Sequence, residues 1–273
     1  MTTTDWLYID KIRKLHFSGD LLTTRNAEVK SLIHSLPVVF SETPLVTVRR
    51  TAWRKALREM EWFLSGNPTC PLELADTWWK GQLNPNGKYW GGYGQQLRTW
   101  NFSGYDQIET LINGLIHHPN SRRHIITTWH PEDMARITEL NDNSNTPTTC
   151  HNTITQLFVR YGKLHLNTYQ RSADILLGVP HNWIQTWAML MWLATRVKLE
   201  VGSMCWVFGD LHLYQHPTHI QTAEQLIGVE TSDRYPNPFE LRYHPTCREF
   251  LAEDFKMAGG VPEPFVHTKP ALL

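Results

Sequence analysis

Long hydrophobic runs are missing from this 273-residue sequence. No stretch approaches the roughly 18 apolar residues that a membrane-spanning helix needs. The opening residues lack the basic group and apolar run of a secretory signal. An excess of charge of one sign is also missing, because 26 Lys and Arg residues balance 26 Asp and Glu residues. We therefore expect a cytoplasmic protein with no nucleic-acid partner and no membrane partner.

Cysteine is scarce, with four residues scattered along the chain. No two of them form a Cys-x-x-Cys pair, which disfavours structural zinc and is typical of reduced thiols in a cytosol. A lone cysteine is more often an inert small hydrophobe than a nucleophile. Cys150 therefore becomes a candidate only through its neighbours in the sequence.

Repeats, low-complexity tracts and Pro/Gly/Ser linkers are absent too, which predicts a single domain over residues 1–273. Residues 68–100 are rich in Gly, Asn and Trp and predict irregular structure. Hydrophobic periodicity predicts helices over residues 4–16, 51–64, 106–117, 182–198 and 216–228. It predicts strands over residues 121–130, 153–169 with a turn at 161–163, and 204–214. The predicted fold class is α+β, a mixed sheet with one face covered by helices.

Charged residues stand close to the predicted buried helix over residues 182–198. Arg171 and Asp174 precede it, and isolated charges are costly to bury, although a solvated turn is the simpler explanation. Glu59 falls on the helix predicted over residues 51–64, where an exposed helical carboxylate is the ordinary alternative. Each feature is weak alone, but their order and spacing are informative.

Together these segments resemble the thymidylate synthase family. The similarity includes YQRSADILLGVPHN at 169–182, a Cys-His pair upstream of it, and GDLHLY at 209–214. It extends to EMEWFLSG at 59–66, SRR at 121–123 and Gly-Tyr-Gly at 92–94, and it covers about residues 25–228. The resemblance implies one catalytic domain that uses a face of its sheet to form an obligate homodimer.

The resemblance also implies covalent chemistry on deoxyuridylate (dUMP). Cys150 is the implied nucleophile toward C6 of the pyrimidine, which makes C5 reactive toward the one-carbon unit of 5,10-methylenetetrahydrofolate, the implied co-substrate. We expect Arg171 to favour the thiolate, because cationic neighbours lower the pKa of a thiol. Glu59 is expected to move protons at C5 and at the ring carbonyl.

Binding roles follow from the same resemblance. The implied phosphate ligands are Arg25, Arg171 and Ser172, with Arg122 and Arg123 reaching across from a second subunit. Arginine forks suit phosphate oxygens. His212 and Tyr214 match residues that bind the sugar hydroxyl, and the positions implied near the folate are Trp79, Tyr93, Asp174 and Gly178.

Asn182 is implied to select the base, because an amide can donate to uracil O4 and accept from N3–H. Related deoxycytidylate hydroxymethylases have Asp at this position, so Asn182 indicates dUMP. A helix N-cap is the structural alternative for this residue.

Several positions depart from ordinary thymidylate synthases. Thr148 and Thr149 replace the usual Pro-Pro before the nucleophile, His181 replaces a Phe, and Gln82 replaces a Trp. Glu61 replaces an apolar residue, as in the deoxycytidylate hydroxymethylase. Because polar groups then stand where an apolar wall would exclude water, we expect 5-hydroxymethylation of dUMP, as in some bacterial viruses.

Four alternatives stay open. The nearest is thymidylate synthase itself, which the C-terminal segment 261–273 favours through its resemblance to the synthase's closing tail. The others are methylation or hydroxymethylation of dCMP, an inactive relative that only binds nucleotide or RNA, and a metal site at His212, His216 and His219. Since His212 belongs to the sugar-binding motif, we expect no metal.

Overall fold

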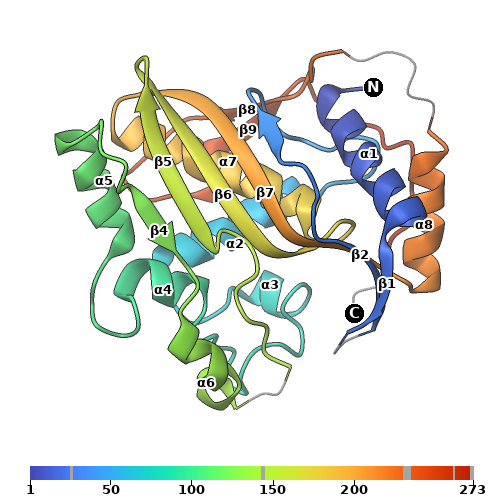
Figure 1. Ribbon diagram of the computed structural model, residues 1–273. Helices are drawn as coiled ribbons and strands as arrows, with labels where there is room; N and C mark the ends of the chain where they lie inside the picture. Colours follow the sequence, from blue (N-terminus) through green and yellow to red (C-terminus); the bar gives the residue numbers. More distant parts are fainter. Residues whose placement is uncertain (25–26, 143–144, 230–234, 261, 271–273) are drawn as a thin grey trace.

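A twisted mixed sheet forms the centre of the computed structural model, which describes residues 1–24, 27–142, 145–229, 235–260 and 262–270 (Figure 1). Its strand order is β1-β2-β7-β6-β5-β4, and β3 also pairs with β7. The strands are β1 (Asp20–Thr23), β2 (Glu28–Leu32), β3 (Val38–Phe40), β4 (Ile125–Thr127), β5 (Ile154–Arg160), β6 (Lys163–Asp174) and β7 (Glu200–Tyr214). A separate hairpin pairs β8 (Glu240–Tyr243) with β9 (Phe255–Ala258).

The two longest strands, β6 and β7, run parallel, whereas the other pairs of described strands are antiparallel. Their register runs from Lys163 beside Glu200 to Asp174 beside His212. The carboxyl ends of parallel strands lie at the same edge of a sheet. The register therefore brings the 169–174 segment and the 209–214 segment together.

Helices cover one face of the sheet, with α7 and α2 behind it in Figure 1. The opposite face is open, and Ile125, Ile154 and Tyr169 are at least 40% exposed there. The helical elements are α1 (Thr3–Ser18), α2 (Trp53–Ser65), α3 (Leu72–Ala75), α4 (Tyr93–Thr99), α5 (Gln107–His117), α6 (Pro131–Asn141), α7 (Val179–Arg196), α8 (Pro217–Ile227) and the 3-10 turn η1 (Ala252–Asp254). Within the described ranges, none of these helices has the length and apolar character to cross a bilayer.

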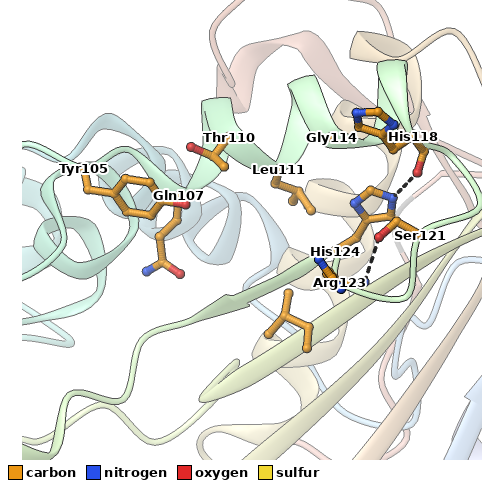
Figure 2. A pocket seen from close by; sticks show the side chains of 10 residues that line it. Tyr105, Gln107, Thr110, Leu111, Gly114, His118, Ser121, Arg123 and His124 are labelled. Carbon is orange, nitrogen blue, oxygen red and sulfur yellow. Dashed lines mark hydrogen bonds between the residues drawn. The ribbon is translucent and has the colours of Figure 1, made fainter.

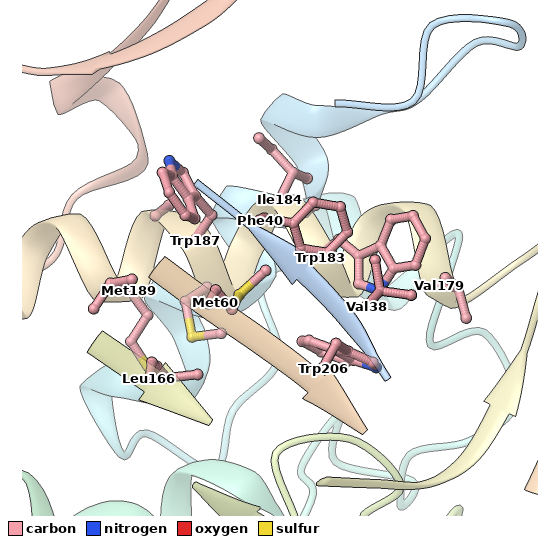
Figure 3. Close-up of a cluster of buried hydrophobic side chains, with 14 of the residues drawn as sticks. Val38, Phe40, Met60, Leu166, Val179, Trp183, Ile184, Trp187, Met189 and Trp206 are labelled. Atoms are coloured by element: carbon pink, nitrogen blue, oxygen red, sulfur yellow. The ribbon is translucent and has the colours of Figure 1, made fainter. Parts of the chain in front are cut away.

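The main core lies between the covered face and α7 (Figure 3). Trp183 of α7 and Trp206 of β7 are fully buried, and the rings of Trp183 and Phe40 lie 4.8 Å apart. Burying such side chains contributes about 1.5–3 kcal/mol each to folding. This packing fixes α7, and with it every polar residue that α7 carries, against the sheet.

The predicted fold class is confirmed, including the mixed sheet and the covered face. The stripe on α2 (Trp53, Leu57, Met60 and Leu64) is buried as predicted, and Gly66 ends that helix at φ 73°. The prediction of irregular structure over 68–100 is wrong in part, because α3 and α4 lie there. The strand expected over 121–130 is only the three-residue β4, and α6, β1 to β3, β8 and β9 were not predicted.

Candidate active site

The loop that carries Cys150 is held against strand β6. The backbone N–H of Arg171 donates to the carbonyl oxygen of Cys150 at 2.8 Å, and that of Ser172 approaches the same oxygen at 3.5 Å. The cysteine therefore lies at the sheet edge where β6 and β7 bring Asp174 beside His212. Five positions named by the resemblance are thus placed together by backbone pairing alone.

Tyr93, the first residue of α4, contacts the nucleophile directly. Its hydroxyl oxygen accepts the backbone N–H of Cys150 at 2.8 Å and that of His151 at 3.4 Å. The sulfur of Cys150 lies 3.2 Å from the same hydroxyl. Because the two N–H groups occupy the lone pairs of the oxygen, its O–H is directed to donate to the sulfur. The resemblance implied Tyr93 only as a group near the folate.

The pKa of Cys150 is set mainly by burial and only in part by Arg171. Burial raises the pKa of the thiol, and this effect outweighs the hydrogen bond from Tyr93 and the charge of Arg171, which both lower it. Arg171 therefore acts in the expected direction without setting the balance. A thiol kept protonated in this way is protected from oxidation and from stray electrophiles.

The guanidinium of Arg171 lies beside the cysteine loop. Its Nη2 donates to Thr148 Oγ1 at 3.0 Å and to the Thr149 carbonyl at 3.3 Å. The group also lies 5.1 Å from the ring centre of Trp129, a cation–π contact. Nε reaches the Thr149 carbonyl at 3.3 Å, and no residue in the described ranges hydrogen-bonds to Nη1. One edge of the Arg171 guanidinium thus binds the loop that carries Cys150, and another edge is available to an anion.

Glu59 of α2 is a buried carboxylate, 8% exposed, so the alternative of an exposed helical Glu is wrong. Trp79 Nε1 donates to its Oε1 at 2.7 Å, and the amide nitrogen of Gln185 donates to Oε2 at 3.2 Å. Burial raises the pKa of Glu59 to about 7, although both hydrogen bonds act to lower it. A carboxyl group with this pKa can give or accept a proton at neutral pH.

Asn182 lies in the first turn of α7 and is 6% exposed. The helix begins at Val179 with Gly178 as its N-cap, so the N-cap alternative for Asn182 is wrong. No residue in the described part of the chain hydrogen-bonds to its side-chain amide. Gln185 and Thr186 follow at the helical spacing of three and four residues, so the three polar side chains share one face. On that face, the side chain of Gln185 contacts Glu59.

The polar groups at the sheet edge are ordered by local contacts. Asp174 Oδ1 accepts the backbone N–H groups of Leu176 and Leu177 at 2.8 and 3.0 Å. Burial lowers the pKa of His212, but Asp210, whose Oδ1 is 3.7 Å from Nδ1, and Asp174 outweigh it, so the net shift is upward. The ring of Tyr214 meets His212 edge-on at 5.3 Å.

Metal chemistry has no support among the described residues. No three His, Cys, Asp or Glu side chains in those ranges are grouped to hold an ion, and this includes the histidines at 212, 216 and 219. His216 Nδ1 instead lies 3.0 Å from Thr218 Oγ1, at the start of α8.

The implied phosphate ligands are not all together within one chain. Arg122 and Arg123 are exposed just before β4, and Arg25 lies outside the described residues. Arg123 lines a cavity of about 450 Å³ between α5 and β4 (Figure 2). Neither Cys150 nor Glu59 lines this cavity. Arg123 therefore faces a cavity that the chain's own cysteine does not line.

Two departures from the family pattern have different structural roles. His181 Nδ1 lies 2.7 Å from the Leu177 carbonyl, and Nε2 accepts the N–H of Ala52 at 3.2 Å. Both nitrogens are therefore used by the backbone, and burial lowers the pKa of this histidine to about 4. Gln82 donates to the Trp78 carbonyl at 3.4 Å, and no described residue donates to its amide oxygen. Gln82, and not His181, has a polar atom left for water.

Sequence reasoning missed Gln185, His151 and Trp129. For Gln185 a signal existed: the helix over residues 182–198 is apolar except for Asn182, Gln185 and a few others. Polar residues at i and i+3 in a buried helix must face other polar groups. For Trp129 no local signal was available, because its contact with Arg171 depends on tertiary packing.

A cysteine beside a tyrosine hydroxyl, a carboxyl group with a pKa near neutrality and a guanidinium with an available edge define an enzyme of covalent nucleophilic catalysis. The family model described as thymidylate synthase matches residues 7–272. The chain belongs to the thymidylate synthase family, and it is a transferase of one-carbon groups from folate to C5 of dUMP.

Proposed function

We propose that the enzyme converts dUMP to 5-hydroxymethyl-dUMP, with 5,10-methylenetetrahydrofolate as the one-carbon donor and tetrahydrofolate as the second product. The observation that carries this choice is Gln82, whose amide oxygen is left available for water where the family has a tryptophan. Water near the reacting carbon would divert the reaction from hydride transfer to hydroxyl addition.

In the first step the sulfur of Cys150 bonds to C6, and the electron pair moves through C5 to the oxygen at C4. The bond from the one-carbon unit to folate N10 opens, and C5 bonds to that carbon. C5 then loses its proton, and the remaining bond from the one-carbon unit to folate N5 breaks, which releases tetrahydrofolate. The base now carries an exocyclic methylene. Glu59, held by Trp79 and Gln185, is suited to exchange the protons of these steps.

In the last step a water oxygen bonds to the methylene and its proton passes to a base. The electron pair returns to the ring, the C6–S bond breaks, and the Cys150 thiolate is released. Thymidylate synthesis differs only here, because hydride from the folate reaches the same carbon and dihydrofolate forms. Exclusion or admission of water is therefore the variable that separates the two products.

Substrate recognition is proposed to involve the buried amide of Asn182 for the uracil edge. Phosphate would be bound by the available edge of Arg171 and by Ser172, with Arg25 from the same chain. His212 and Tyr214 would contact the sugar hydroxyl. The residues proposed to contact the folate are Trp79, Tyr93, Asp174 and Gly178. Two of them are also hydrogen-bonded within the site, Trp79 to Glu59 and Tyr93 to Cys150.

A homodimer is proposed as the active species. The open face of the sheet exposes apolar side chains at Ile125, Ile154 and Tyr169, which would be covered by a second copy. Arg122 and Arg123 stand exposed beside this face and would complete the phosphate site of the other subunit. The site of one chain is then incomplete without its neighbour.

Thymidylate synthase proper is the second candidate. The C-terminal segment favours it, because Val266 donates its backbone N–H to the Val48 carbonyl at 2.9 Å, just before α2. A tail held near α2 is suited to cover the site and exclude water.

Incubation of the enzyme with dUMP and methylenetetrahydrofolate separates the two candidates. The proposal predicts a nucleotide heavier than dUMP by CH₂O and no dihydrofolate absorbance. A gain of CH₂ with stoichiometric dihydrofolate would instead establish thymidylate synthesis. dCMP serves as the control substrate and should not react.

A further inference from the structure

Gln185 is a fully buried polar residue on α7 that the steps above use only as a contact of Glu59. In one orientation of its side-chain amide, both the nitrogen and the oxygen have hydrogen-bond partners. The nitrogen then donates to Glu59 Oε2 at 3.2 Å and to the Ala56 carbonyl at 3.3 Å. In that orientation the amide oxygen faces His151 Nε2 at 3.4 Å.

This geometry determines the tautomer of His151. An amide oxygen can only accept a hydrogen bond, so the imidazole must carry its proton on Nε2. The ring is neutral at physiological pH, because burial lowers the pKa of His151 to about 4. Nδ1 is then an acceptor that needs a donor.

Asn152 supplies that donor. Its side-chain Oδ1 lies 2.9 Å from His151 Nδ1 and 3.0 Å from the Thr186 hydroxyl, and Asn152 itself is only 6% exposed. With its oxygen toward the ring, the amide nitrogen has no partner in the described part of the chain, which is costly for a buried donor. When the amide is turned, its nitrogen faces the ring and donates to Nδ1, and the Thr186 hydroxyl oxygen at the same position becomes an acceptor. One tautomer of His151 therefore orients both flanking amides.

We propose that Gln185 is a positioning residue that fixes the Glu59 carboxylate and sets the His151 tautomer, through a chain of hydrogen bonds directed from Asn152 through His151 and Gln185 to Glu59. Aligned hydrogen bonds in a buried site polarise one another in the same direction. The carboxylate is held from its two oxygens by Trp79 and Gln185, so it cannot rotate when a proton moves. The role of Glu59 in the reaction rests on the proposed function, whereas the chain itself does not.

The first test is nitrogen-15 NMR of histidine-labelled wild-type protein, with the His151 signal assigned by its loss in His151→Gln. The expected result is a neutral ring with the proton on Nε2 from about pH 6 to about pH 8. A proton on Nδ1 would overturn the proposal. This measurement needs no substrate and no activity, so it succeeds or fails independently of the proposed function.

The second test compares Gln185→Met with Gln96→Met. Gln96 is an equally buried glutamine on α4 that donates to Gly91 and Asp133 and does not contact Glu59. In Gln185→Met the carboxyl-carbon signal of Glu59 should titrate at higher pH than in wild type, because one donor to the ionised form is lost. Turnover should fall at least tenfold with a smaller change in KM.

Gln96→Met should lose thermal stability while the Glu59 titration stays at its wild-type position. An unmoved titration in Gln185→Met, or an equal shift in both variants, would show that Gln185 has only a packing role. If wild type makes no product from dUMP but shows the Nε2 proton and the shifted Glu59 titration, the proposed function fails and the hydrogen-bond chain stands.

Discussion

At the residue scale, the raised pKa of Glu59 connects activity with stability. Its pKa moves from 4.5 to about 7 on folding because the side chain is buried. Folding therefore favours the protonated carboxyl. The associated stability is present at low pH and is lost as the pH rises from about 4.5 through 7.

Glu59→Gln removes this pH-dependent term. As the pH rises from about 5 to about 8, the stability of the variant relative to wild type should increase by about 2–3 kcal/mol. Turnover of the variant should fall roughly 10²–10⁴-fold. Urea unfolding at the two pH values measures the first effect and steady-state kinetics the second. A stability difference that stays constant with pH would contradict the assigned pKa.

Arg171 is the residue at which charge and geometry can be separated. Arg171→Lys keeps the positive charge but loses the fork, including the contacts to Thr148 and Thr149. We expect nucleotide affinity to weaken by roughly 1–3 kcal/mol, the scale for losing a charge-assisted hydrogen bond. Titration calorimetry with dUMP measures it, and Arg160→Lys, on the exposed end of β5, is the matched control. Equal affinity in both variants would exclude the phosphate role.

At the element scale, two departures can be tested against each other, His181 at the junction of α2 and α7 and Gln82 in the segment after α3. His181 joins the elements by accepting from Ala52 and contacting Leu177, so His181→Phe should reduce stability by about 1 kcal/mol or more with little change in product. Gln82→Trp should raise the share of dTMP, because it removes the polar group available to water. Mass analysis of the nucleotide reports the ratio. A larger shift from His181→Phe than from Gln82→Trp would reverse this assignment.

Long elements with a clear period were predictable from the sequence, and short ones were not. The apolar stripe of α2 and the apolar surface of α7 predicted both helices, because burial of a helix face dictates the spacing of apolar residues. Strands such as β3 have only three residues, too few to show a period, and their pairing with β7 is set by tertiary packing.

The site residues that belong to sequence motifs were predictable. The contacts between them were not, because those contacts depend on tertiary packing. Cys150 and Glu59 came from motifs, but the pKa of each depends on burial that a sequence does not display. The contact between Tyr93 and Cys150 joins segments 57 residues apart. Such long-range contacts follow from the register of β6 and β7 and from the position of α4.

At the scale of the whole molecule, the proposed homodimer shares its sites between subunits. A dimer that combines a Cys150→Ser chain with an Arg122→Ala, Arg123→Ala chain has one complete site, although each variant alone should be nearly inactive. Mixing the two after reversible dissociation should restore up to about a quarter of wild-type activity per total chain, the share expected if chains pair at random. Activity that stays at the level of the parents would contradict the shared site.

The central claim is that the sulfur of Cys150 bonds to C6 of the pyrimidine. The most direct measurement is the mass of the protein after incubation with 5-fluoro-dUMP and methylenetetrahydrofolate, because fluorine blocks proton loss at C5 and arrests the reaction at the covalent stage. We predict a mass gain equal to the nucleotide plus the folate, located on the peptide that contains Cys150 and absent in Cys150→Ser. An unmodified protein, or an adduct on another residue, would contradict the account.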